Sequence, residues 1–242
     1  MVHLIGIVGP LRSGKTTFAS LLPWLIKNEV EMKGGHIELF ANYDLLGARR
    51  LERKEDWYAV AEAHGSVCVW DEAHIHFDSR RFSKFENNFA THLLTYVGKM
   101  AAIQVFATPS IKRLDTRIRE ILEILIVVRK GNAGTHYDFY DYQADYAGPF
   151  GKYLHTKFLP SRKRAAVHAL NLFDTHSFVT GFPLPKNETE ARRFMSELEA
   201  AHERGRRKSE AIKIEHKSKR ARPSKSRVPG SQDTGVPVPV HR

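Results

Sequence analysis

The chain has 242 residues, of which 42% are hydrophobic and 27% are charged, enough apolar material for one large domain or a domain with an appendage. Its net charge is +11, but residues 192–242 carry 14 Lys and Arg against 6 Asp and Glu and so account for +8. Residues 1–191 are nearly neutral at +3. A single cysteine, Cys68, excludes a disulfide framework and a cysteine-based zinc site.

The sequence has no apolar run near the roughly 20 residues that a transmembrane helix needs. The N-terminus lacks the basic segment of a signal peptide and leads directly into a glycine-rich turn. We therefore expect an intracellular protein with no membrane span.

Short apolar runs alternate with stretches of helical periodicity along the first half of the chain. The runs predict strands at residues 3–8, 36–41, 66–70, 101–107 and 124–128. Helices are predicted from Lys15 to the Gly34-Gly35 pair and over residues 56–64, 81–99 and 111–123. This order predicts an α/β fold with a mostly parallel, doubly wound sheet whose ligands bind at the carboxyl ends of the strands.

The second half of the chain has a different residue pattern. Residues 135–142 alternate aromatic and polar side chains, which predicts an antiparallel edge hairpin, and residues 165–178 are expected to form a last packed segment. Beyond them large apolar residues become rare and Lys, Arg and Ser dominate. We expect a main domain over residues 1–185, a charged helix over 186–204 and a basic, disordered tail over 205–242.

A phosphate-binding loop follows the first predicted strand. Residues 9–16 match the pattern of Gly, four residues, Gly, Lys, Ser/Thr, which a chain of this length meets by chance on the order of 1% of the time. The two glycines permit backbone angles that aim amide groups at an anion, and the loop opens a helix whose N-terminus is positive. The predicted nucleotide-binding residues are Gly9, Pro10, Leu11, Arg12, Ser13, Gly14, Lys15, Thr16 and Thr17.

Two acidic residues follow the third predicted strand. Asp71 and Glu72 come directly after the apolar run that ends at Trp70, and adjacent side chains point in different directions. We expect Thr16 and Asp71 to hold Mg²⁺, Lys15 to contact the β and γ phosphates of ATP, and Glu72 to act as general base on the attacking water.

These motifs resemble those of the Zot-like and FtsK-HerA P-loop ATPases of phages and other viruses. The resemblance extends over roughly residues 3–180 and depends on the phosphate loop, the Asp-Glu-Ala-His run at 71–74, Ser-Arg-Arg at 79–81 and Leu-Asp-Thr-Arg-Ile-Arg at 114–119. It implies an additional-strand P-loop fold and Mg²⁺-dependent ATP hydrolysis. Members include DNA-packaging motors and filamentous-phage assembly proteins.

The resemblance also implies a sensor and an arginine finger. The strand after the acidic motif ends in a polar sensor, which places Thr108 in that role, while Pro109 stands where the family has Gln. A downstream arginine reaches a neighbouring subunit's nucleotide, so Arg119 or Arg117 becomes the candidate finger. Such completion in trans requires a homo-oligomeric ring, a hexamer in the relatives.

The resemblance favours a motor that packages double-stranded DNA into a viral capsid through a packaging vertex, in the host cytoplasm or the virion. Its alternative is a filamentous-phage assembly ATPase, whose members usually carry a membrane span that this sequence lacks. A non-motor nucleotide-dependent DNA-binding protein is the remaining alternative. The basic residues beyond Arg204 suit DNA contact that does not depend on base sequence, because no aromatic residue is interleaved among them.

Overall fold

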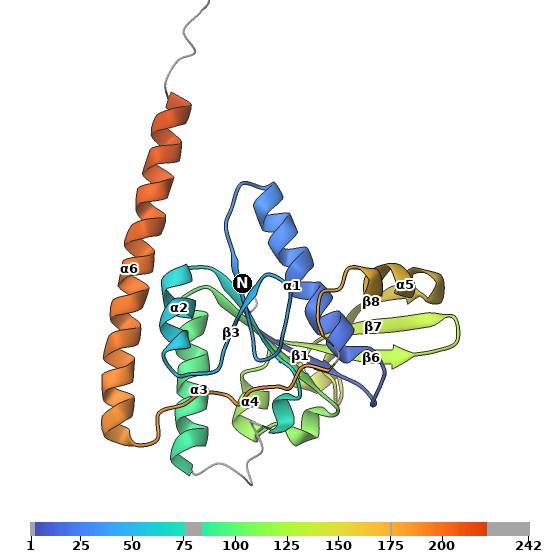
Figure 1. Cartoon of the computed structure of the whole chain (residues 1–242). Coiled ribbons are helices and arrows are strands. Elements are labelled where there is room, and N and C mark those ends of the chain that lie inside the picture. Colours follow the sequence, from blue (N-terminus) through green and yellow to red (C-terminus); the bar gives the residue numbers. More distant parts are fainter. Residues whose placement is uncertain (1–2, 76–83, 175, 222–242) are drawn as a thin grey trace, which may run out of the picture.

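The computed structural model describes residues 3–75, 84–174 and 176–221. Within these ranges the chain forms one sheet (Figure 1). The sheet has eight strands in the order β3-β2-β4-β5-β1-β6-β7-β8. The strands are β1 (Leu4–Val8), β2 (Glu38–Ala41), β3 (Ala48–Arg50), β4 (Ser66–Trp70), β5 (Ala102–Thr108), β6 (Ile124–Lys130), β7 (Gly134–Asp141) and β8 (Lys152–Pro160).

The first six strands are parallel, which confirms the predicted α/β class. Strand β5 lies between β1, which leads into the phosphate loop, and β4, which leads to Asp71, with Val8 opposite Thr108 and Trp70 opposite Phe106. This inserted strand is the arrangement expected of the additional-strand type. The carboxyl ends of β1, β4 and β5 therefore lie along one edge of the sheet.

Helices cover both faces of the sheet, as a doubly wound fold requires. The helices are α1 (Lys15–Met32), α2 (Asp56–Ala63), α3 (Lys84–Gly98), α4 (Thr116–Glu120), α5 (Ser161–Ala169) and α6 (Glu188–Ala221). Apolar residues of α2, α3, α4 and α6 share one core cluster, whereas Phe18 and Ala19 of α1 pack in a second cluster on the opposite face. Stacking of Phe18 on Tyr137, with ring centroids 4.1 Å apart, joins α1 to β7.

The predicted antiparallel edge of the sheet is confirmed, and it is larger than predicted. Residues 135–142 correspond to one strand of it, β7, which pairs with β6 on one side and β8 on the other. The edge strand β8 and the short strand β3 were not predicted. Periodicity alone missed β8 because its residues are mostly exposed and alternate weakly. The helix predicted over 111–123 is a short 3-10 turn, Ile111–Arg113, followed by α4.

The C-terminal helix is the main correction to the predicted organisation. It does not end at Arg204 but continues to Ala221, so residues 205–221 are helical. Phe194, Leu198 and Ala201 are buried against α2, and α6 projects beyond the rest of the domain (Figure 1). At Gly205 the two helices approach so closely that a Cβ atom would lie 2.3 Å from the Glu62 carbonyl oxygen.

Several of the basic residues that were assigned to the tail lie in α6 and pair with carboxylates of α6 or α2. Arg206 pairs with Glu203 and Glu210, each at 2.9 Å, and Arg207 pairs with Glu203 at 2.9 Å. Lys208 pairs with Glu62 of α2. The expected Ser-Arg-Arg motif at 79–81 and residues 222–242 lie outside the described residues. No described helix combines the length and apolarity needed to cross a membrane.

Candidate nucleotide-binding site

The phosphate loop has the backbone geometry that its glycines predict. Gly14, at the N-cap of α1, has φ 99°, and Arg12 also lies in the left-handed region with φ 59°. A Cβ atom on Gly9 would lie 2.6 Å from the Val128 carbonyl oxygen, so only glycine fits between β1 and β6. Ser13 is 3% exposed, and its hydroxyl has no hydrogen-bond partner among the described residues. The loop thus holds a buried hydroxyl without a partner at the helix N-terminus, where an anion would bind.

Lys15 and Thr16 lie at the centre of the site. Lys15 is 6% exposed, and its Nζ donates to the Pro10 carbonyl oxygen at 2.9 Å within the loop. Burial lowers the pKa of Lys15, and the nearby carboxylates of Glu72 and Asp71 act in the opposite direction. The Thr16 hydroxyl donates to Asp71 Oδ2 at 2.9 Å, across 55 residues of sequence. The two predicted metal ligands are therefore neighbours in the fold.

The two acidic residues have different environments. Asp71 is 8% exposed, and burial raises the pKa of its carboxyl, although hydrogen bonds from Thr16 and the Glu72 amide oppose that shift. Glu72 is more exposed and has a left-handed backbone with φ 49°. Its Oε2 lies 3.3 Å from His74 Nδ1, close enough for the imidazole to orient this carboxylate. Asp71 is held at the loop by Thr16, whereas Glu72 is the more exposed of the two acids.

A cavity of about 700 Å³ lies over the phosphate loop. One wall consists of residues 11–17 with Asp71 and Glu72, all of which were predicted as site residues. The opposite wall was not predicted and comes from β6, β7, β8, α5 and the irregular segment that follows α5. Its members include Lys130, Tyr137, Leu159, Arg164, His168, Phe173, Asp174, Ser177, Phe178 and Val179.

The segment after α5, residues 170–182, crosses the site and is called the strap here. The sequence predicted a packed segment over 165–178, but α5 has no buried residue and the strap is the part that packs, with Leu172 and Phe182 buried. Residue 175 lies outside the described residues. The Leu46 amide donates to the Leu172 carbonyl oxygen at 2.7 Å, beside an isolated bridge between Leu45 and Phe173.

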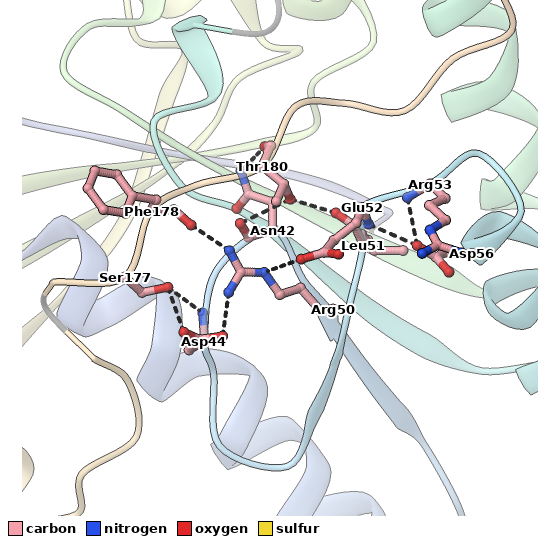
Figure 2. A network of polar contacts seen from close by, with 10 residues as sticks. All are labelled: Asn42, Asp44, Arg50, Leu51, Glu52, Arg53, Asp56, Ser177, Phe178 and Thr180. Atoms are coloured by element: carbon pink, nitrogen blue, oxygen red, sulfur yellow. Dashed lines mark hydrogen bonds and ion pairs between the residues drawn. The ribbon is translucent and has the colours of Figure 1, made fainter.

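Figure 2 shows the polar network that fixes the middle of the strap to the loop after β2 and to β3. The Ser177 hydroxyl donates to Asp44 Oδ2 at 3.0 Å and accepts from the Asp44 amide. Arg50 donates to Asp44 Oδ1 at 2.5 Å and to the Phe178 carbonyl oxygen at 2.7 Å. Ser177 and Arg50 together hold the pKa of Asp44 below its ordinary value.

Asn42 links this network to the acidic motif. Its side chain is fully buried, and Nδ2 donates both to the Asp71 carbonyl oxygen and to the Thr180 carbonyl oxygen at 3.1 Å. The Asp71 amide donates back to Asn42 Oδ1 at 2.8 Å. Asn42 follows β2 at the carboxyl edge of the sheet, and that position is the one signal by which the sequence could have identified it.

The remaining predicted residues do not line this cavity. Thr108 is buried, and its hydroxyl donates to the Ser110 carbonyl oxygen at 3.4 Å. Arg119 donates to the Thr116 hydroxyl at 2.8 Å and lines a separate cavity beside α4. Arg117 is half-buried on the same helix. Arg117 and Arg119 thus lie on α4, outside this cavity, whereas Thr108 ends β5 opposite Val8, the last residue of β1 before the loop.

The site has oxygen ligands that fit Mg²⁺. Thr16 Oγ1 and Asp71 Oδ2 are 2.9 Å apart, about the separation of two adjacent ligands of an octahedral ion held at roughly 2.1 Å. No group of three His, Cys, Asp or Glu side chains suited to a metal forms within the described ranges. Mg²⁺ would therefore be shared between these two side chains, water and the phosphates of a nucleotide.

The fold and the loop define the class: the chain has a P-loop NTPase fold of the additional-strand type, with the phosphate loop and the acidic strand in the expected places. No family model matches the sequence, and no curated protein matches it. Among solved structures, it is similar to the N-terminal domain of zonular occludens toxin from Neisseria meningitidis, with 15% identity, a TM-score of 0.50, and coverage of 72% of this chain and 100% of that one. This likeness confirms the predicted resemblance at the level of the fold.

Two further structural matches have lower TM-scores. The genome packaging NTPase B204 from Sulfolobus turreted icosahedral virus 2, in complex with ATP-gammaS, is 13% identical with a TM-score of 0.44, covering 64% of this chain and 96% of that one. The flagellar accessory protein FlaH from Methanocaldococcus jannaschii is 12% identical with a TM-score of 0.42, covering 65% of this chain and 84% of that one.

Proposed function

We propose that this protein is a Mg²⁺-dependent ATPase. The observation that carries the proposal is the contact between Thr16 and Asp71, because it joins the phosphate loop to an acidic strand 55 residues away at the edge where ligands bind. The buried Lys15 would leave the Pro10 carbonyl oxygen to contact the β and γ phosphates. Bound Mg²⁺ would neutralise charge that develops on the transferred phosphoryl group.

Glu72 is the proposed general base. It lines the cavity beside Asp71, and His74 lies close enough to orient its carboxylate. A carboxylate in this position can accept a proton from water that attacks the γ phosphate. Asp71 is tied to Thr16 and to the Asn42 network, so the two acids have separate roles.

The test compares nucleotide binding and hydrolysis in variants of the two motifs. Lys15→Ala should weaken ATP binding, while Glu72→Gln should retain binding and lower kcat by about 10²- to 10⁴-fold. Lys112→Ala, an exposed lysine outside the cavity, is the control and should behave as wild type. Wild-type rates in Glu72→Gln, or undiminished ATP binding in Lys15→Ala, would contradict the proposal.

We further propose that hydrolysis drives a motor that packages double-stranded DNA into a viral capsid, acting as a homo-oligomeric ring in the host cytoplasm or virion. The support is the sequence resemblance at residues 71–74 and 114–119. The position of Arg119 outside its own chain's cavity suits a finger that acts on a neighbour. ATPase rate per subunit should then rise with protein concentration and with double-stranded DNA, and a rate indifferent to both would contradict the ring motor.

A filamentous-phage assembly ATPase is the second candidate, favoured by the fold likeness to the zonular occludens toxin domain. Its site would be the same, so the nucleotide experiments do not separate the two functions. The DNA response does: a rate that rises with protein concentration but ignores double-stranded DNA would favour assembly over packaging.

A further inference from the structure

The phosphate loop sets the orientation in which a nucleotide would bind. Lys15, Thr16 and Asp71 mark the end of the loop where the β and γ phosphates and Mg²⁺ belong, so the nucleoside must extend away from Asp71. A second cavity of about 520 Å³ adjoins the main one in that region. The two cavities share four lining residues, Thr17, His168, Phe173 and Asp174. Space for a base and a ribose therefore continues from the loop toward the strap.

The two cavities differ in their cationic residues. The main cavity is lined by the cations Arg12, Lys15, Lys130 and Arg164, which suit a triphosphate, together with the acidic residues Asp71, Glu72 and Asp174. Among the described residues, the adjoining cavity is lined by no lysine or arginine, and its one acidic residue is Asp174. A polyanion placed there would be repelled, whereas a neutral nucleoside with hydroxyl donors would not.

Phe173 and Asp174 are held in place by the strap's contacts. Phe173 is half-buried, and its backbone bridges Leu45. The Asp174 amide donates to the Asp44 carbonyl oxygen at 3.4 Å, and Asp174 Oδ1 accepts from the His176 amide at 2.8 Å. An ionised carboxylate has capacity for several more donors, and a ribose offers two hydroxyl groups. An aromatic ring is a platform for any nucleobase.

We propose that Phe173 and Asp174 form the nucleoside-binding wall of this site, with the base against the Phe173 ring and the ribose hydroxyls donating to the Asp174 carboxylate. The inference rests on the proposed function, because it assumes that the phosphate loop binds a nucleoside triphosphate. It adds a residue pair that neither the loop nor the acidic strand supplies.

The experiment measures the Mg²⁺-dependent affinities of the full chain for ATP, dideoxy-ATP, which lacks both ribose hydroxyls, and inorganic tripolyphosphate. Asp174→Asn should lower the affinity for ATP roughly 10-fold, while the affinities for dideoxy-ATP and tripolyphosphate stay unchanged. Phe173→Ala should lower the affinity for both nucleotides roughly 10-fold and leave that for tripolyphosphate unchanged. Tripolyphosphate binding thus reports that the variants are folded.

Matched controls exist in strands β7 and β8. Asp141 accepts from the Gln143 amide two residues on, as Asp174 does from His176, and lines neither cavity. Phe158 is 46% exposed on β8 and also lies outside both cavities. Asp141→Asn and Phe158→Ala should leave all three affinities unchanged.

The outcomes separate this inference from the function on which it rests. Equal losses for ATP and tripolyphosphate in the Asp174 or Phe173 variants, or no loss for either, would overturn the nucleoside wall. Wild-type protein that binds tripolyphosphate as tightly as ATP would also overturn it while leaving the phosphate site intact. Wild-type protein that binds none of the three ligands would contradict the proposed function itself.

Discussion

Asn42 and Asp71 hold each other through two hydrogen bonds, one from Asn42 Nδ2 to the Asp71 carbonyl oxygen and one from the Asp71 amide to Asn42 Oδ1. The same asparagine exchanges backbone and side-chain bonds with Thr180 of the strap. One buried side chain therefore fixes both the acidic residue at the loop and the strap that lines the cavity. Asn42 therefore links the position of Asp71 to the position of the strap.

Replacing Asn42 with Ala should destabilise the protein by about 2–4 kcal/mol, because it leaves buried backbone groups of Asp71 and Thr180 without partners. Chemical denaturation of the nucleotide-free protein measures the change. Asn132→Ala, at an exposed position, is the control and should be neutral within about 0.5 kcal/mol. A loss no larger than that of the control would show that water replaces the missing amide.

Replacing Asp71 with Asn should stabilise the nucleotide-free protein at neutral pH by roughly 1 kcal/mol and abolish Mg²⁺-dependent ATP binding. The folded-state pKa of Asp71 is raised above its unfolded value by burial, so its ionisation costs stability. That cost is absent below the unfolded pKa, grows as pH rises from the unfolded to the folded pKa, and is fully present above the folded pKa. Thermal melts from acid to neutral pH should therefore show the variant's advantage increasing with pH, and a constant or decreasing advantage would contradict this account.

Replacing Arg50 with Lys should loosen the strap, because one ammonium cannot hold both Asp44 and the Phe178 carbonyl oxygen as the guanidinium does. Hydrogen exchange should become faster at the Ser177 and Thr180 amides. Arg49→Lys is the adjacent control, since Arg49 makes an exposed contact with Glu38 at 3.7 Å. Equal exchange rates in the two variants would mean that the network does not fix the strap.

Replacing Gly205 with Ala should destabilise the protein by about 1–3 kcal/mol, because the new methyl group would meet the backbone of α2 at Glu62. In a solvent-exposed helix the same change stabilises the helix by about 1 kcal/mol. The sign of the change in stability therefore shows whether α6 packs against α2. Ser196→Ala on an exposed position of α6 is the control. A stabilised Gly205→Ala variant would show that α6 does not pack on α2 in solution.

Mixing two inactive variants tests whether Arg119 acts as an arginine finger on a neighbouring chain. Lys15→Ala and Arg119→Ala should each be inactive alone, and their mixture should regain ATPase activity if Arg119 of one chain completes the intact phosphate loop of another. Lys15→Ala mixed with Glu72→Gln is the control and should stay inactive, because both lesions lie in one cavity wall. No recovery with Arg119→Ala, but recovery with Arg117→Ala, would move the finger to Arg117.

The sequence by itself determined the parallel α/β fold and one wall of the site. Apolar runs of strand length, the glycine spacing of the loop and the Asp71-Glu72 pair are local signals, and the edge rule for parallel sheets is enough to bring Thr16 and Asp71 together. The backbone conformation of the phosphate loop depends on residues adjacent in the chain, so the sequence alone predicts that Gly9 to Thr17 form it. The contact at 2.9 Å agrees with that interpretation.

Only the tertiary structure determined which residues form the opposite wall of the cavity and that the first part of the basic segment is helical. Phe173, Asp174 and Ser177 lie in an aperiodic strap whose position depends on contacts with Asp44 and Asn42, more than 130 residues earlier, and no local pattern encodes such contacts. The length of α6 was missed for a related reason. In the sequence its charged residues resemble a solvated tail. In the fold, Gly205 packs against α2 and Lys208 pairs with Glu62, so this part of the helix has tertiary contacts.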